Sequence, residues 1–342
     1  MKKSRFALAA AAALAITTLV TGCTGNADSG ANDPAGVKDA AAEKVVVGID
    51  VPFHPIYAYM QGKSDELFAD TDYTVEFTVL DATTQVPAFG RGDLDVITTV
   101  PSFQPRIKEQ YGIDTSYFFP MARWTPGPEL LVAPGSTATS IEDLAGKRVA
   151  IAPLASRFGG EQAAVMAATG ERIDEYFELV ETDAAAQELA QGRVDAAFLE
   201  APATAPLLED GYTPIFNVQQ AFEEAFGDPG VMNGGFITST AFAEQNPEFI
   251  ATLVEVTQEV WTLFQEDPAT VIAVASEVSG VPPEQLELVG QVLNLTDMTE
   301  EQKRVSQRDV ETWTELYPLL QESGFIAEAP KDPASLFIVS AG

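Results

Sequence analysis

The only histidine of the chain, His54, lies in a proline-containing stretch between two aromatic residues, Phe53 and Tyr57. Its imidazole can hydrogen bond to a bound solute or cap a neighbouring carbonyl group, and the sequence favours neither role. Flat aromatic side chains can sandwich a planar ring or pack in an apolar core, and these alternatives also stay open. The aromatic candidates for a binding site are Phe53, Tyr57, Phe103, Trp124 and Phe158.

Two further loops carry charged candidates. Ser156 and Arg157 stand at the start of a helix-length segment, where a hydroxyl, a guanidinium and free backbone N–H groups can together hold an anion. The alternative for Arg157 is a surface ion pair with Glu161, one helical turn later. Glu200 can pair with an amine-bearing ligand or remain a solvated loop acid. Hydroxyl groups in other loops complete the candidates: Thr83, Thr99 and Ser102.

The composition excludes several other kinds of site. With one Cys and one His, the chain has no disulfide framework, no Cys-based zinc site and no His-pair metal motif. Its 51 Asp and Glu outnumber its 19 Lys and Arg, so its net charge of −32 repels nucleic acid. It has no GxSxG elbow, no P-loop and no GxGxxG after a strand, and a serine triad would need His54 as its only base. We therefore expect a protein that binds without catalysis, with no catalytic residue, metal ion or cofactor.

The N-terminus has the features of an export signal. Three basic residues precede an apolar run, Phe6 to Val20, which is too short to span a bilayer. The run ends at Val20-Thr21-Gly22-Cys23, which resembles the lipobox of bacterial lipoproteins, where the Cys receives a diacylglycerol and the signal is cleaved before it. We expect residues 1–22 to be the signal peptide, Cys23 the lipidated N-terminus, and residues 23–43 a flexible tether.

From residue 44 onward, short β-branched runs alternate with helix-length segments, which predicts a parallel α/β sheet. The first strands are expected at 45–50, 74–80 and 94–98, and a second series at 148–152, 177–181 and 196–199. Residues 129–133, between proline–glycine turns, predict a crossing between two lobes, and residues 236–238 a return strand. Long helices then follow at 247–264, 268–278, 282–293 and 299–323, the last with Thr299 and Gln302 as a capping box.

At this point the sequence resembles a known family. Residues 140–151 resemble the segment that opens the second lobe in substrate-binding proteins of ABC importers of the nitrate, sulfonate and taurine type, which are relatives of thiamine-pyrimidine binding proteins. Residues 88–96 and 189–198 both resemble the helix end, glycine turn, aspartate and strand that recur in this family. Asp95 and Asp195 in these motifs each precede a short buried strand, so we expect structural roles for both.

The resemblance covers about residues 44–264 and implies an α/β, two-lobed periplasmic-binding-protein type II fold with a helical C-terminal portion. Lobe 1 is expected at residues 44–128 and 235–342, and lobe 2 at residues 129–234. The fold implies a ligand held between the lobes and hinge closure on binding. In open α/β sheets ligands bind outside the carboxyl ends of strands, where the loops with the candidate residues stand.

The implied protein is a monomeric receptor at the cell membrane, lipid-anchored on the extracytoplasmic face and touching the membrane through that anchor only. It would capture a small organic solute, pyrimidine-like, an aromatic acid or sulfonate-like, and deliver it to an ABC permease with its ATPase. The alternatives are a ligand-sensing lipoprotein without transport and an enzyme similar to the pyrimidine synthases. Those synthases carry a Cys-rich segment, which this chain lacks.

Overall fold

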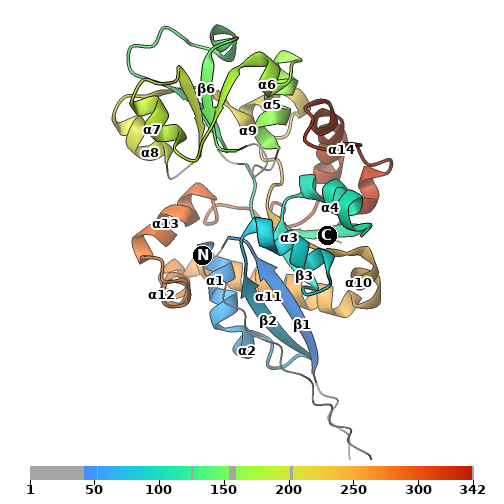
Figure 1. The fold of residues 1–342 in the computed structure, drawn as a ribbon. Helices are drawn as coiled ribbons and strands as arrows, with labels where there is room; N and C mark the ends of the chain where they lie inside the picture. The colour runs from blue at the N-terminus through green and yellow to red at the C-terminus, as the bar shows by residue number, and fades with distance from the viewer. Residues whose placement is uncertain (1–41, 52, 125–126, 154–158, 201–202, 341–342) are drawn as a thin grey trace, which may run out of the picture. The chain divides into compact units, whose positions relative to one another are not determined.

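The computed structural model describes residues 42–340 apart from 52, 125–126, 154–158 and 201–202. The expected signal peptide and Cys23 lie outside the described residues, as do Ser156, Arg157 and Phe158. Residues 41–342 form one compact unit by their contacts. This unit contains two β-sheets, and we call each sheet with the helices packed on it a lobe (Figure 1).

The sheet of the first lobe has the strand order β2-β1-β3-β10-β4. Its strands are β1 (Glu43–Ile49), β2 (Tyr73–Val79), β3 (Val96–Thr99), β4 (Thr115–Pro120) and β10 (Gly235–Ser239). β1 pairs in parallel with β2 and β3, whereas β10 lies between β3 and β4 and is antiparallel to both. The parallel pairing predicted for the first strands is confirmed, and β10 is the return strand expected at residues 236–238, by which the chain re-enters this lobe.

The sheet of the second lobe repeats this arrangement with the order β7-β6-β8-β5-β9. Its strands are β5 (Glu129–Val132), β6 (Arg148–Ile151), β7 (Glu178–Glu181), β8 (Ala196–Leu199) and β9 (Thr213–Asn217). β5 is antiparallel to its neighbours β8 and β9, while β6 is parallel to β7 and β8. In each sheet the antiparallel strand is the one by which the chain arrives from the other lobe, so the remaining strands end at one common edge.

Helices cover both faces of each sheet (Figure 1). In the second lobe, alternate strand residues divide between the two faces: Leu130 packs with α5 and α6, and Leu131 packs with α7 and α8.

The chain contains fourteen α-helices in the part that the structure describes. The earlier ones are α1 (Pro55–Gly62), α2 (Ser64–Leu67), α3 (Ala82–Gly90), α4 (Gln104–Tyr111), α5 (Gly160–Thr169) and α6 (Ile173–Tyr176). The later ones are α7 (Ala185–Ala190), α8 (Thr204–Glu209), α9 (Val218–Phe226), α10 (Thr240–Gln245), α11 (Pro247–Glu266), α12 (Pro268–Ser279), α13 (Pro283–Val292) and α14 (Gln307–Glu322). Within the described ranges, none of these helices has both the length and the apolar character needed to cross a membrane.

The structural roles expected for Asp95 and Asp195 are confirmed, and they are the same in both lobes. The carboxylate of Asp95 accepts a hydrogen bond from the backbone N–H of Val46 in β1, at 2.8 Å. The carboxylate of Asp195 accepts one from the backbone N–H of Arg148 in β6, at 3.0 Å. Each aspartate therefore ties the turn before a strand to the neighbouring strand of its sheet.

The last long helix, α14, begins later than predicted. The capping box expected at Thr299 and Gln302 forms, with the Thr299 N–H donating to Gln302 Oε1 at 2.9 Å, but it leads only into a turn. The Gln302 carbonyl accepts a hydrogen bond from Arg123 at 2.9 Å instead of one from within a helix. A second capping box, formed by Ser306 and Asp309, starts α14. The sequence contains both capping boxes, and the prediction chose the first. The hydrogen bond that engages the Gln302 carbonyl could not be predicted, because Arg123 lies far away in the sequence.

Candidate functional site

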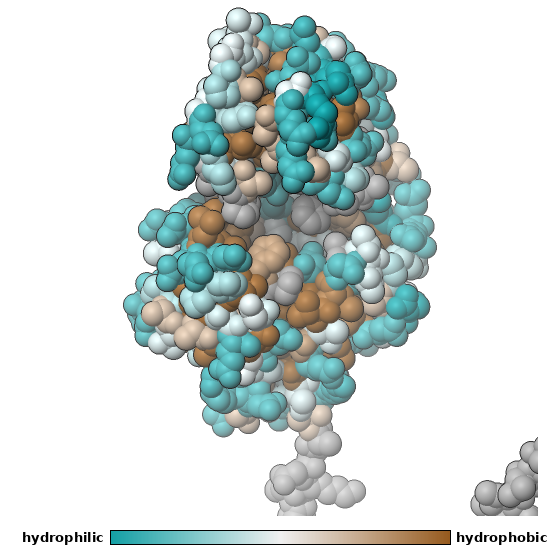
Figure 2. All heavy atoms as spheres, turned by 60° about the vertical axis from the view of Figure 1, so that its left-hand side comes forward, coloured by the Kyte–Doolittle hydropathy of each residue, from teal (hydrophilic) through white to brown (hydrophobic). Residues whose placement is uncertain are grey.

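A pocket of about 640 Å³ lies at the carboxyl edge of the first sheet and reaches the second lobe. Its wall comes from the loops after β1 and β4, the segment before β10, the loop after β8, and α13. Figure 2, which brings the α13 side forward, shows apolar surface along the hollow between the lobes. Three residues predicted to bind a ligand line this pocket: Phe53, Trp124 and Glu200.

Trp124 forms the junction between the pocket and the second lobe. Its side chain is 5% exposed, and its ring centroid lies 5.2 Å from that of Phe222 in α9. A Cβ atom placed on Gly160, the first residue of α5, would lie 2.7 Å from the indole ring. Only glycine therefore lets the start of α5 approach the indole this closely, so Trp124 connects the pocket wall with α5 and α9.

Arg123 also lines the pocket, but its guanidinium is already paired and fully hydrogen bonded within the protein. Its guanidinium donates to the two carboxylate oxygens of Asp309 at 2.6 and 3.1 Å, and both side chains are buried. The remaining N–H groups donate to the carbonyls of Gly230, Gln302 and Arg304 at 2.9–3.2 Å. Since a guanidinium has five N–H donors, none is left for an anion in the pocket.

His54 and Tyr57 lie next to the pocket in the buried part of the same loop and helix. Nε2 of His54 is 3.3 Å from the carbonyl oxygen of Met121, and burial lowers the His54 pKa to about 4. The ring is therefore neutral at pH 7; because a carbonyl only accepts, Nε2 carries the proton and Nδ1 is an acceptor. Nδ1 is buried without a partner among the described residues. The Tyr57 ring lies 4.6 Å from the His54 ring, and burial raises the Tyr57 pKa well above its ordinary value.

Asp50, the residue that follows β1, is a functional candidate that the sequence reasoning did not single out. Burial raises its pKa to about 6, against the opposing effect of a hydrogen bond from the Thr98 hydroxyl at 2.6 Å. Its negative charge also contributes to the raised pKa of Tyr57. A partly buried carboxyl group with a shifted pKa beside a pocket is typical of binding sites. The sequence feature that could have identified Asp50 as a candidate is its position directly after a β-branched run.

The other described candidates lie at the same edge of the first sheet but outside the pocket wall: Thr83, Thr99, Ser102 and Phe103. The Thr83 hydroxyl donates to Asp81, whose carboxylate caps α3. The Phe103 ring packs edge-on against Phe325 at 5.9 Å. Their proposed contact with a ligand stays a prediction, as does that of Ser156, Arg157 and Phe158.

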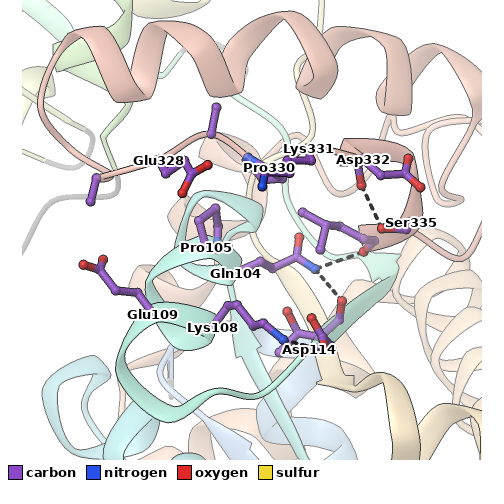
Figure 3. A pocket seen from close by; sticks show the side chains of 14 residues that line it. Gln104, Pro105, Lys108, Glu109, Asp114, Glu328, Pro330, Lys331, Asp332 and Ser335 are labelled. Carbon is purple, nitrogen blue, oxygen red and sulfur yellow. Dashed lines mark hydrogen bonds and ion pairs between the residues drawn. The ribbon is translucent and has the colours of Figure 1, made fainter.

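A second hollow, of about 580 Å³, lies in the first lobe between α4 and the C-terminal segment (Figure 3). Three of its polar side chains are bonded to one another or to the backbone of the lobe. The Gln104 amide donates to the carbonyls of Leu336 at 2.9 Å and Thr115 at 3.3 Å, and Lys108 pairs with Asp114 at 2.6 Å. Thr115 begins β4, so this hollow is at the opposite edge of the sheet from the loops that follow the strands. We therefore assign it a structural role in holding the C-terminal segment.

Comparison with known proteins identifies relatives of the whole two-lobed unit. Residues 53–235 match the family described as ABC transporter, phosphonate, periplasmic substrate-binding protein. The periplasmic sulfonate-binding protein SsuA from Methylobacillus flagellatus KT is 18% identical, with a TM-score of 0.68 over 87% of this chain and 92% of its own. The aliphatic sulphonate binding protein SsuA from Escherichia coli is 16% identical, with a TM-score of 0.65 over 87% and 93%.

The same fold also occurs in an enzyme. The desulfurization enzyme DszB is 16% identical, with a TM-score of 0.54 over 86% of this chain and 96% of its own. No curated protein sequence matches the chain. At these identities the solved structures define the fold, and they confirm the two-lobed α/β fold predicted from the sequence.

Proposed function

Since this chain belongs to the family of periplasmic phosphonate substrate-binding proteins of ABC transporters, we propose that it captures a small organic ligand in the pocket beside Trp124. It would then deliver the ligand to an ABC permease with its ATPase. The chain would act as a monomeric lipoprotein on the extracytoplasmic face of the cell membrane, anchored through Cys23. The substrate-binding role of the ABC import type follows from the family; the ligand, the anchor and the permease are the proposal.

The pocket is the observation that carries this proposal. Its volume of about 640 Å³ falls within the usual range of small-molecule sites, roughly 300–1,000 Å³. It combines residues of the first lobe, Phe53 and Trp124, with Glu200 of the second lobe, so closure of the lobes would tighten every contact. The family match to substrate-binding proteins, which covers residues 53–235, favours binding over catalysis.

The chemistry of the ligand is supported in part by the relatives. The family name refers to a phosphonate and both SsuA names refer to a sulfonate, so an organic oxyanion is our first candidate. Pyrimidine-like compounds and aromatic acids remain in the proposal because of the aromatic residues Phe53 and Trp124. Ser156 and Arg157 remain the proposed anion-binding residues, since Arg123 is fully engaged elsewhere.

A ligand should raise the thermal stability of the compact unit 41–342. At a hundred times the dissociation constant, a binder is expected to stabilise the folded state by about 2.7 kcal/mol. We would measure the melting temperature with sulfonates, phosphonates, pyrimidines, aromatic acids and amines. Tryptophan fluorescence should change in parallel through Trp124, because Trp261 and Trp313 are fully buried elsewhere.

The matched control for the fluorescence signal is Trp124→Phe, which keeps an aromatic ring in the wall and should abolish the change in emission while the thermal shift remains. A compound that is chemically converted during the measurement would establish the enzyme alternative instead. A stabilising ligand that no permease preparation accepts from the protein would favour the sensor without transport. Absence of any shift across all five classes would contradict the proposed function.

Cys23→Ser should abolish lipid attachment. We expect the full-length protein, expressed in bacteria fed labelled palmitate, to carry the label only when Cys23 is present, because a serine offers no thiol for the diacylglycerol. The N-terminal mass should show cleavage before residue 23 only in the protein that keeps Cys23. Ser140→Ala, a change in the folded unit, is the labelling control. Equal labelling of the Cys23→Ser variant would overturn the proposed anchor.

A further inference from the structure

Helix α13 has two apolar faces, and only one of them is covered by the rest of the protein. On the inner face, Leu286 is fully buried, and a Cβ atom on Gly290 would lie 2.8 Å from the ring of Phe264 in α11. On the opposite face, Leu288, Val289 and Val292 are half-buried and line the pocket. These three residues have the i, i+1, i+4 spacing of neighbours on one side of a helix. The second apolar face of α13 is thus a wall of the pocket.

The facing wall is apolar too. Phe53 is 46% exposed, an unusually accessible position for so large an apolar side chain, and Val51 and Trp124 lie on the same side. Four polar side chains also line the pocket: Arg123, Glu200, Asn233 and Gln285. The side-chain oxygen of Asn233 lines it and is buried without a partner among the described residues. The pocket therefore offers two apolar walls and a hydrogen-bond acceptor, Asn233 Oδ1, that a donor group on a ligand would satisfy.

The pocket has room for more than a minimal oxyanion. A water molecule takes about 30 Å³ of liquid volume, so an anion of five heavy atoms would leave most of a volume of about 640 Å³, and both apolar walls, in contact with water. We propose that the ligand is a small amphiphile, with an alkyl or aryl body of several carbons between α13 and Phe53 and a head group that donates a hydrogen bond to Asn233 Oδ1. This inference rests on the proposed function and assigns Leu288, Val289 and Val292 as specificity-determining residues.

Binding of homologous series should reveal the apolar body directly. We would titrate the unit 41–342 by calorimetry with straight-chain phosphonates, whose P–OH group can donate to Asn233 Oδ1, and with straight-chain sulfonates, which have no donor, each from the methyl to the octyl compound. Each added methylene group that enters the pocket should tighten binding about fourfold, which corresponds to about 0.8 kcal/mol. The gain should stop once the space between α13 and Phe53 is filled.

Substitutions on α13 separate the pocket wall from the fold. Leu288→Asn and Val292→Asn should remove most of the gain with chain length, a loss of about tenfold or more for the octyl compound, while the methyl compound binds as before. Glu287→Asn places the same residue on the exposed side of the same helix and should leave the whole series unchanged. Because all three variants introduce Asn into one helix, a difference in helix stability alone cannot produce the expected pattern.

Three outcomes would overturn the inference. An affinity that does not depend on chain length would leave the proposed function intact but show that α13 does not contact the ligand. Binding of a pyrimidine without binding of any alkyl compound would have the same consequence. Concentration-dependent self-association in the ultracentrifuge that Leu288→Asn abolishes would mean that a second copy covers this face. If no compound of any class stabilises the protein, the proposed function fails as well.

Discussion

Replacing Arg123 with methionine should lower the free energy of unfolding by about 3–5 kcal/mol. Only 6% of the Arg123 side chain and 2% of the Asp309 side chain are exposed, and the two are joined by a bidentate ion pair. The methionine would leave the Asp309 carboxylate buried without its counter-charge and three backbone carbonyls without a donor. Urea-induced unfolding, followed by circular dichroism, measures the difference.

The matched control is Arg91→Met, which removes a cation paired with Asp93 at the surface. Both of these side chains are about 60% exposed, so the expected change is below about 1 kcal/mol. Exchanging both partners of the buried pair, Arg123→Met with Asp309→Leu, should restore only part of the lost stability: no unpaired charge remains, but the three carbonyls stay without a donor and the capping box of α14 is lost. If the Arg123 and Arg91 variants unfold at the same urea concentration, the buried pair contributes no more than a surface one.

Gly235→Ala should destabilise the fold by about 3 kcal/mol or more. A Cβ atom on Gly235, the first residue of β10, would collide with the Tyr117 hydroxyl and with the backbone carbonyl oxygen of Phe119. Overpacking typically costs about 1–3 kcal/mol, and here one of the colliding atoms belongs to the backbone of the paired strand, which cannot rotate away. Differential scanning calorimetry should show a clearly lower melting temperature.

The preceding residue supplies the control for this substitution. A Cβ atom on Gly234 would meet the Cβ of Ala122 at 3.8 Å, an ordinary contact distance. Gly234→Ala should therefore change the stability by less than about 1 kcal/mol. Equal melting temperatures for the two variants would show that β10 can shift away from Phe119, and that the close packing of these strands is not fixed.

The sequence predicted those strands whose residues are apolar and bounded by turn residues, and it missed three others, one of which, β5 (Glu129–Val132), was expected only as a crossing between the lobes. β4 (Thr115–Pro120) is buried along its whole length and rich in aromatic residues, so it has no alternating pattern. β9 (Thr213–Asn217) contains Pro214, which is tolerated because β9 lies at the edge of its sheet. Neither pattern distinguishes a strand from a loop when the neighbouring strands are unknown.

For the candidate site, the rule that ligands bind after the carboxyl ends of strands led to two residues that do line the pocket, Phe53 and Glu200, and Trp124 was a candidate because of its aromatic ring. The same rule did not predict α13, which reaches the pocket through the packing of α11 and α12 rather than through a strand. Nor did it predict the ion pair between Arg123 and Asp309, because these residues lie far apart in the sequence. Local patterns identify loops that face a site, whereas tertiary packing decides which distant elements close it.

The position of β10 also sets an order of assembly. Phe236 pairs with Thr98 of β3 and with Phe119 of β4, so the middle of the first sheet stays open until β10 has been synthesised. The second sheet, in contrast, is built entirely from the continuous stretch between Glu129 and Asn217. Contacts between distant residues form slowly because a long loop must close first. A chain that emerges from its N-terminus therefore completes its middle lobe first, and the edge that carries the pocket takes shape last.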